Sequence, residues 1–379
     1  MWLVPALRFP EFTEEWKEEQ LDEIAELSKG VCISKEQLSE NGKPCILYGE
    51  LYTRYKSEII RKVISKTNIE SSNLKHSKRN DVIIPCSGET AIDIAVARCI
   101  PFDNILLGGD LNVIRLHKGD GAFMAYQLNG KRKIDIAKLA QGVSVVHLYG
   151  ENLKTIKTYN PCLQEQQKIV RLLSILDERI STQNKIIEDL RLLRDAISVC
   201  LLSPKSDWKC YKVSEIADIG RGRVISSKEI ANQNNPQYPV YSSQTSNEGV
   251  MGYLDNYAFD GEYITWTTDG ANAGTVFYRN GRFNCTNVCG TLKLHYQFDA
   301  YYCSLVLANV TKKYVSVNLA NPKLMNNTMA AIKLYLPPFQ EQKRMAQLFR
   351  KMDENITLEH KLLLSYQKQK HYLLQQMFI

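Results

Sequence analysis

The side chains with the greatest hydrogen-bonding capacity lie in two polar turns, and each turn follows a predicted strand. Residues 87–90 follow the apolar run 81–85, and residues 267–272 follow the run 262–266. Short β-branched or aromatic runs that are bounded by Gly, Asn, Asp and Ser are typical of strands. The turns supply many hydrogen-bond donors and acceptors but no catalytic arrangement. We therefore expect two surfaces that bind rather than a catalytic centre.

The sequence motifs of several enzyme classes are absent. Without G-x-x-x-x-G-K-[ST] or G-x-G-x-x-G, we expect neither an ATP-driven motor nor a dinucleotide site. Residues 336–339 resemble an amino-methyltransferase tetrapeptide, but Leu336 cannot accept the hydrogen bonds that this chemistry requires. Asp207 and Lys209 resemble a nuclease fragment that lacks its upstream acidic partner. No metal-binding spacing joins the six histidines, which are His76, His117, His147, His295, His360 and His371.

The composition is that of a globular protein with a mild basic excess. The 379 residues include 48 Lys and Arg against 41 Asp and Glu, so the net charge of +7 is compatible with a nucleic-acid partner. The 10 cysteines form no C-x-x-C pair, which favours reduced thiols. We find neither a signal-peptide pattern nor an apolar run of ~18 residues. These features predict a cytoplasmic protein.

The sequence repeats itself at the ends of two halves, whereas the middles differ. A pattern of Trp-Lys followed by Glu-Ile-Ala in residues 16–25 recurs 192 positions later, in residues 208–217. A second pattern, Gln-Glu-Gln followed by Leu and Asp-Glu, lies in residues 164–178 and recurs 176 positions later, in residues 340–354. A duplicated frame with different centres predicts one scaffold that presents two different surfaces.

Each half ends in a predicted long helix with an apolar stripe. Apolar residues recur at a spacing of three and four, which is typical of a coiled-coil seam. In the first helix these residues are Ile169, Leu172, Leu176, Ile180, Ile187 and Leu190. In the second helix they are Met345, Leu348, Met352, Ile356, Leu363 and Tyr366. Both seams are interrupted at one shared position, by Gln183 and Glu359, and a helix over residues 164–200 would be roughly 55 Å long.

The two helices can bury their stripes in either of two ways. Each helix could cover its own domain, or the two could pair within the chain. We favour an antiparallel pair, because a duplication with a pseudo-two-fold axis turns the copies head to tail. The expected fold is therefore a tandem duplication of two α/β domains joined by two long helices that form an antiparallel coiled coil.

These motifs resemble the specificity subunits of type I restriction-modification systems over nearly the whole chain. The opening 7–12 before Trp16, the helical regions 161–177 and 336–353, and the stretch 238–276 are similar to segments of that family. One departure is Cys162, where the second copy has Pro338. The resemblance implies two target-recognition domains, 1–160 and 205–336, and two spacer helices, 161–204 and 337–379.

The resemblance also implies a function without catalysis in this chain. Each domain would read one half of a bipartite target in double-stranded DNA, and the helices would set the gap and dock two methylation subunits. Those subunits would bind S-adenosylmethionine and modify adenine N6. Restriction subunits with ATP and Mg would complete the complex, so no cofactor is expected in this chain.

DNA reading requires cations on phosphates and polar side chains on base edges. For the phosphates we expect Lys29 and Lys35 in the first domain, and Arg221, Arg223 and Lys228 in the second. For the bases of the first half-site we expect Tyr48, Ser87, Glu89, Thr90 and Asp93. For the second half-site we expect Ser242, Gln244, Thr268, Asp269 and Asn272.

Two other classes of function remain open from the sequence. The chain could be a bifunctional methyltransferase or nuclease with an unrecognised active site. It could also be a tandem-domain scaffold that binds proteins or glycans, since 20 tyrosines are available for contacts. DNA binding differs from both in its dependence on salt, because phosphate contacts release counterions.

Overall fold

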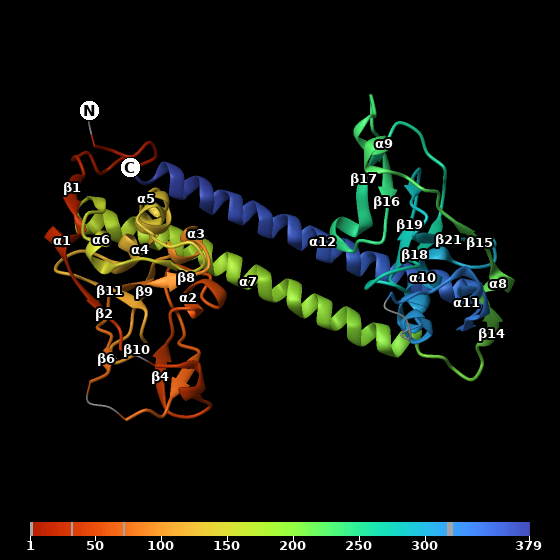
Figure 1. The fold of residues 1–379 in the computed structure, drawn as a ribbon, viewed down its shortest axis with the longest axis horizontal. Helices are drawn as coiled ribbons and strands as arrows, with labels where there is room; N and C mark the ends of the chain where they lie inside the picture. The colour runs from red at the N-terminus through yellow and green to blue at the C-terminus, as the bar shows by residue number, and fades with distance from the viewer. Residues whose placement is uncertain (1–2, 32, 71–72, 317–320) are drawn as a thin grey trace. The chain divides into compact units, whose positions relative to one another are not determined.

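The structure is a computed structural model that describes residues 3–31, 33–70, 73–316 and 321–379. Two compact units make up the chain: residues 1–186 with 359–379, and residues 187–358. Helices α7 (Leu163–Leu202) and α12 (Phe339–Gln376) each contribute to both units (Figure 1). Each unit thus takes in parts of both long helices, unlike the sequence-based domains 1–160 and 205–336.

The first unit is built on a four-stranded antiparallel sheet and a five-stranded sheet. Their strand orders are β2-β11-β7-β9 and β3-β5-β4-β10-β6. The short elements in chain order are β1 (Lys17–Gln20), α1 (Leu21–Ile24), β2 (Ala25–Lys29), η1 (Lys35–Gln37), β3 (Leu38–Ser39), β4 (Lys43–Ile46), α2 (Glu50–Thr53), β5 (Ser65–Thr67), β6 (Lys75–His76), β7 (Asp81–Pro85), β8 (Ser87–Gly88), α3 (Ala91–Ile94), β9 (Arg98–Ile100), β10 (Leu106–Leu107), β11 (Leu111–Leu116), α4 (Gly121–Asn129), α5 (Lys133–Lys138), β12 (Val146–His147), α6 (Gly150–Leu153) and β13 (Lys157–Asn160). The predicted strand at 81–85 is confirmed as β7, whose five residues are all buried.

The second unit repeats the four-stranded antiparallel sheet with the order β15-β21-β18-β19 and adds a three-stranded sheet, β17-β16-β20. Its short elements are β14 (Lys209–Lys212), α8 (Val213–Ile216), β15 (Ala217–Arg221), α9 (Ser227–Ala231), β16 (Tyr238–Tyr241), η2 (Ser246–Gly249), β17 (Val250–Leu254), β18 (Tyr263–Thr267), β19 (Val276–Arg279), β20 (Asn284–Cys285), β21 (Cys289–Leu294), α10 (Ala300–Val310), η3 (Thr311–Tyr314), α11 (Asn326–Ala331) and β22 (Lys333–Leu336). The predicted strand at 262–266 is present one residue later, as β18. The variable middle of each half therefore forms its own four-stranded sheet of the same topology, although the two sequences do not match.

A repeated glutamine joins each long helix to its domain. Gln166 donates from Nε2 to the Pro161 carbonyl at 2.9 Å and accepts from the Asp120 backbone N–H at 2.9 Å. In the second unit, Gln342 makes the same two contacts with Pro337, at 2.8 Å, and Asp299, at 3.1 Å. Asp120 and Asp299 in turn cap the N-termini of the buried helices α4 and α10. The second glutamine of each Gln-Glu-Gln repeat is thus buried where the long helix packs against its domain.

The repeated tryptophans are both buried, but their indole nitrogens differ in partners. Trp16 donates to Glu165 Oε1 at 3.3 Å, and Arg8 Nε donates to the same oxygen at 2.7 Å. The indole nitrogen of Trp208 has no hydrogen-bond partner among the described residues. The N-terminal segment of the first unit supplies Arg8, whereas in the second unit Lys205 lies 3.9 Å from Glu341, the equivalent of Glu165, and 5.7 Å from the centre of the Trp208 ring.

Within each unit the two long helices run antiparallel. In the first unit, Gln183 contacts Glu359, and further along Asp177 contacts Lys370. In the second unit, Arg194 contacts Asp353, and Lys205, three residues beyond the end of α7, lies 3.9 Å from Glu341. Residue numbers rise along α7 as they fall along α12, which confirms the antiparallel pairing.

The apolar stripe differs from the predicted seam at one turn of each helix. Ile169, Leu176, Ile187, Met345 and Leu363 are buried as expected. Ile180, Leu190, Met352, Ile356 and Tyr366 are half-buried. However, Leu172 and Leu348 are 36% and 42% exposed, and the next residues, Leu173 and Phe349, are buried in their place. Adjacent residues lie about 100° apart around a helix, so only one member of each apolar pair faces the core.

Candidate nucleic-acid interface

The first unit has a concavity of about 790 Å³ at the junction of its two sheets. Its lining brings together Lys35 from η1, Tyr48 before α2 and Glu89 after β8, all predicted DNA contacts. Tyr52 and Arg54, which the sequence did not single out, also line it. The concavity therefore places two cations, two phenols and several carboxylates, Glu89 among them, on one surface.

Tyr52 lies beside two of the predicted base-reading carboxylates. Burial raises the pKa of the Tyr52 hydroxyl, and the negative charges of Glu89 and Asp93 raise it further. The phenol consequently remains protonated at neutral pH and can donate a hydrogen bond. The sequence did not indicate a role for Tyr52, because this residue of the short helix α2 comes close to residues 89–93 only in the folded chain.

Thr90 and Asp93 form the N-terminal cap of α3. The Asp93 backbone N–H donates to Thr90 Oγ1 at 3.2 Å, and that hydroxyl donates to Asp93 Oδ2 at 2.6 Å. Both side chains are exposed, so a base could still reach them. Ser87 differs from expectation, since it is only 5% exposed and its hydroxyl donates to Asp110 at 3.2 Å. Direct base contact by Ser87 would require this loop to rearrange.

Lys29 and Arg221 occupy equivalent positions of the repeat and end the equivalent strands β2 and β15. Lys29 is exposed, and its ammonium lies 5.9 Å from the centre of the Tyr149 ring. The glycine that follows each cation allows two segments of the backbone to approach closely. A Cβ on Gly30 would lie 1.9 Å from the Gly108 carbonyl oxygen, and a Cβ on Gly222 would lie 2.2 Å from the Cys285 carbonyl oxygen. The repeated cation-glycine pair thus marks the same strand end in both units.

Arg221 joins two predicted base-reading residues of the second unit. Its Nη2 donates to Thr268 Oγ1 and to Asp269 Oδ2, both at 3.2 Å. Thr268 is fully buried, so, contrary to our expectation for a base contact, its hydroxyl supports Asp269 instead. Asp269 is also 3.7 Å from the Lys323 ammonium. These contacts hold the carboxylate of Asp269 in place between two cations.

The loop between β16 and β17 brings together the other predicted readers of the second half-site. Gln244 donates its side-chain amide to the Val250 carbonyl, and Asn272 donates to the Ser243 carbonyl at 3.5 Å. The Ser242 hydroxyl accepts from Thr286 Oγ1 at 3.4 Å. Two turns that are distant in sequence therefore form one polar edge.

This loop contains three consecutive residues with left-handed backbone conformation. Asn247, Glu248 and Gly249 have φ values of 48°, 51° and 83°. Such conformations are costly for residues other than glycine, so the surrounding structure must maintain them. Arg279 lies under the loop and donates from Nη2 to the Glu248 carbonyl at 2.7 Å.

Arg279 is a buried cation that is held mainly by neutral groups. Its guanidinium lies 3.5 Å from the centre of the Tyr241 ring and donates from Nε to Thr265 Oγ1 at 3.3 Å. Burial lowers the pKa of this guanidinium. The sequence missed Arg279, because nothing in a single arginine at the end of β19 shows which loop it supports.

The remaining predicted phosphate contacts of the second unit differ in availability. Arg223 makes two hydrogen bonds to Glu229, and the pair raises the pKa of the arginine while lowering that of the glutamate. Lys228 is exposed on α9. The arginine would have to exchange its carboxylate for a phosphate, whereas the lysine is already accessible.

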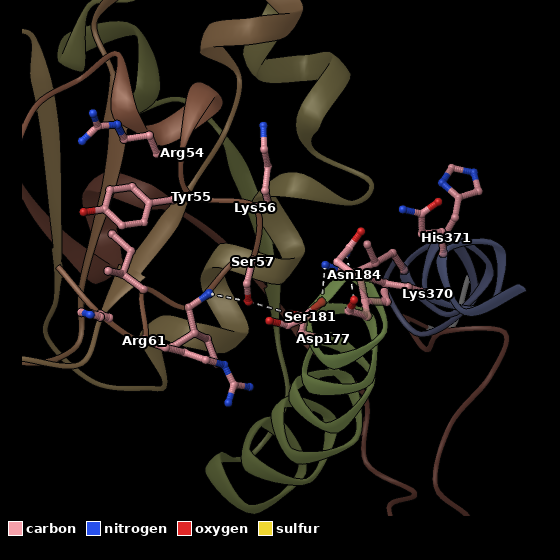
Figure 2. A pocket seen from close by; sticks show the side chains of 16 residues that line it. Arg54, Tyr55, Lys56, Ser57, Arg61, Asp177, Ser181, Asn184, Lys370 and His371 are labelled. Atoms are coloured by element: carbon pink, nitrogen blue, oxygen red, sulfur yellow. Dashed lines mark hydrogen bonds and ion pairs between the residues drawn. The ribbon is translucent and has the colours of Figure 1, made fainter. Parts of the chain in front are cut away.

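A buried charge cluster joins the two helices of the first unit to its domain (Figure 2). The Lys370 ammonium contacts Asp177 Oδ1 at 2.6 Å and also pairs with Glu58. Ser57 and Tyr126 donate to the other oxygen of Asp177, at 2.9 and 2.7 Å. Burial alone would lower the pKa of Lys370, but the two carboxylates together raise it. This cluster fixes one turn of α7 against one turn of α12.

The second unit contains the counterpart of this cluster. Arg194 and Asp353 lie 176 positions from Lys370 and Asp177 respectively, and they form an ion pair. Tyr301 donates to Asp353 as Tyr126 does to Asp177. Burial raises the pKa of the Tyr301 hydroxyl, and Asp353 raises it further. The repeated Asp-Glu pattern thus supplies one carboxylate to each helix pair.

Among the described residues, no group of three or more His, Cys, Asp or Glu side chains could hold a metal ion. No helix in the described part of the chain has the length and apolar character needed to cross a membrane.

Both halves of the chain match one protein family. A family model described as type I restriction modification DNA specificity domain matches residues 13–192 and again residues 205–365. The N-terminus of a putative type I specificity subunit of Mycoplasma pneumoniae is 46% identical over 140 residues, which are 36% of this chain and 74% of the relative. Another putative type I specificity subunit of the same organism is 36% identical over 192 residues, covering 50% of this chain and 79% of the relative. Other relatives are matched over smaller shares of their length, such as 40% and 50%.

Solved structures of the same kind share the fold. The crystal structure of a type I restriction-modification S subunit from M. genitalium superposes with a TM-score of 0.68 at 19% identity, over 99% of both chains. A structure from work on complex assembly of a type I system gives a TM-score of 0.58 at 14% identity, over 95% of this chain and 96% of that one.

Proposed function

This chain belongs to the family of type I restriction-modification DNA specificity proteins, and we propose that it directs such a complex to a bipartite DNA sequence. Each unit reads one half of the target through the polar edge at the ends of its sheet strands. The first unit uses the concavity that holds Lys35, Tyr48 and Glu89, and the second uses the loops that hold Gln244 and Asn272.

One observation carries this proposal: the same four-stranded sheet bears different polar loops in the two units. Equivalent strands end in the cations Lys29 and Arg221, which can contact phosphates in either sequence context. The neighbouring side chains differ in type and spacing, so the two surfaces would read different bases. A single fold can thus serve two half-sites.

The long helices set the gap between the half-sites and dock the methylation subunits. The buried cluster at Asp177 and the partly exposed cluster at Asp353 support a fixed register, since each joins α7 to α12 with a charged pair. Leu172 and Leu348 lie at equivalent positions and remain exposed, as does Leu364. Exposed leucines on helices are suited to burial against partner subunits.

The chain contributes recognition and assembly in the cytoplasm, and its partners contribute the reactions. Two methylation subunits bind S-adenosylmethionine and modify adenine N6 on each side of the gap. Restriction subunits supply ATP- and Mg-dependent translocation and cleavage. The side chains brought together here are donors and acceptors for base edges, and they are held by one another rather than arranged around a nucleophile.

A binding experiment tests this proposal. The chain is assembled with its methylation subunits, and its affinity is measured for a duplex with the methylated motif and for a scrambled duplex, between 50 and 200 mM salt. We expect preference for the motif and a steep loss of affinity with salt, with a slope of about −0.9 per phosphate contacted. Binding that ignores sequence or salt would contradict the proposal.

A further inference from the structure

We infer that the first unit contains a second DNA-contacting surface, a cationic cleft that binds phosphates next to the half-site. The inference deepens the proposed function and rests on it. The cleft has a volume of about 780 Å³ and lies between residues 54–62 and the two long helices of the same unit. Figure 2 shows its walls, with Lys56 and Arg61 on the domain side and Asn184 and His371 on the helix side.

Cationic side chains outnumber carboxylates in the lining of the cleft, and two of the cations, Lys56 and Lys62, have no carboxylate partner among the described residues. Five cationic side chains line it against one carboxylate; they are Arg54, Lys56, Arg61, Lys62 and Lys370. The carboxylate, Asp177, is already bonded to Lys370, Ser57 and Tyr126, so it repels an incoming anion weakly. Concave surfaces lined by one sign of charge concentrate the opposite charge.

Two of these cations are available for an external anion. Lys56 and Lys62 are exposed, and neither has a carboxylate partner among the described residues. Within the described ranges, the one hydrogen bond of the Lys56 ammonium is to the Tyr52 carbonyl, at 3.3 Å. By contrast, Arg54 pairs with Glu50 and Arg61 with Glu178. Phosphate binding by the two lysines therefore costs no existing ion pair.

The cleft adjoins the concavity that we propose reads the half-site, because the two share Arg54 in their linings. The Arg54 side chain is 52% exposed, and Tyr55 and Lys56 follow it directly in the chain. A duplex bound at Lys35, Tyr48 and Glu89 would extend past Arg54 toward Lys56 and Lys62. Its backbone, which is anionic in any sequence, would meet these lysines on the helix side of the half-site.

The chemistry of the lining favours DNA over a protein partner. Of the large aliphatic side chains that line the cleft, Ile60 and Leu374 are 1% and 8% exposed, and Ile59 and Ile180 are half-buried. Protein interfaces are depleted of lysine and enriched in exposed aromatic side chains at their centres. Phosphate contacts, in contrast, require only accessible cations and add affinity without adding sequence preference.

The test measures how DNA affinity depends on salt after Lys56→Ala and Lys62→Ala are combined. In the complex with methylation subunits, loss of two phosphate contacts should reduce the salt slope by about 1.8, which makes the loss of affinity between 50 and 200 mM roughly tenfold smaller. Affinity for motif and scrambled duplexes should fall by the same factor. Lys56→Arg with Lys62→Arg should retain the wild-type slope.

A matched control removes the same charge elsewhere in the first unit. Lys131 and Lys138 are exposed and lie outside the cleft, so Lys131→Ala with Lys138→Ala should leave the slope unchanged. An unchanged slope in the Lys56 and Lys62 double variant would overturn the inference. So would loss of assembly with the methylation subunits, which would identify the cleft as a protein-docking site. Failure of the wild-type complex to prefer its motif would instead reject the proposed function.

Discussion

The side-chain amide of Gln183 donates to the backbone carbonyl of Glu359 at 3.1 Å, and these two residues are equivalent positions of the repeat, 176 residues apart. A repeat position that contacts its own copy is expected where two antiparallel copies of one helix cross. On either side of it along the chain, the repeat supplies the ion pairs Asp177–Lys370 and Arg194–Asp353. Polar groups at a seam fix its register at some cost in stability.

Loss of the buried lysine should destabilise the first unit. Lys370→Met would leave Glu58 and Asp177 buried without their cation, at a cost of about 3–5 kcal/mol in the free energy of unfolding. Arg194→Met should cost less, because its partner Asp353 is 40% exposed. Chemical denaturation of the two variants measures the difference, and equal losses would contradict this account of the cluster.

The contribution of Lys370 should not change between pH 6 and pH 8. Its pKa in the folded chain is raised above its ordinary value of 10.5, so the folded state holds the proton more tightly than the unfolded state does. The stabilisation is therefore complete below pH 10.5 and is lost only as pH rises through the raised value. A difference between wild type and Lys370→Met that varied between pH 6 and pH 8 would show that another group dominates.

Variants of the second reading edge should affect one half-site alone. Gln244→Ala or Asn272→Ala removes an amide that can pair with a base edge, so discrimination at one position should fall by about 1–3 kcal/mol. Glu89→Gln should alter only the other half-site. Methylation of duplexes with single-base changes measures both effects, and changes in both half-sites from one variant would contradict separate reading by two domains.

Arg279 should act as a positioning residue for the second half-site. Arg279→Met removes the donor to the Glu248 carbonyl, so the left-handed residues 247–249 lose their support. We expect weaker discrimination at the second half-site, by about tenfold, with unchanged methylation specificity at the first. Arg282→Ala, an exposed neighbour paired with Asp260, is the control. Equal loss at both half-sites would indicate general destabilisation instead.

The length of the helix pair should determine the gap in the target. A seven-residue insertion in each helix, between Gln183 and Arg194 in α7 and between Asp353 and Glu359 in α12, lengthens the pair by about 10 Å and keeps the contacts on both sides of it in register. This corresponds to about three base pairs at 3.4 Å each. Both half-sites should stay the same while the gap grows, and an unchanged gap in the methylated motif would contradict a role for the helices as the spacer.

The sequence predicted the secondary-structure elements of this protein better than the contacts between their side chains. Strand 81–85 and the two long helices were evident from runs of apolar residues, which report on burial within one element. The seam was misplaced at Leu172 because Leu173 is equally apolar, so residue type could not choose between them. Arg279 and Lys370 gave no signal, since the groups to which they donate lie 14 or more positions away in sequence. Thr268 was expected to contact DNA because it lies in a polar turn. Its burial results from the packing of that turn, which the sequence does not show.

The most direct test is a map of N6-methyladenine in host DNA by single-molecule sequencing, with the gene present and with it deleted while the methylation subunits are still expressed. We predict that one split motif, with two half-sites and a gap of fixed length, is methylated only when the gene is present. Persistence of that motif after deletion of the gene would contradict the central claim that this chain selects the sequence.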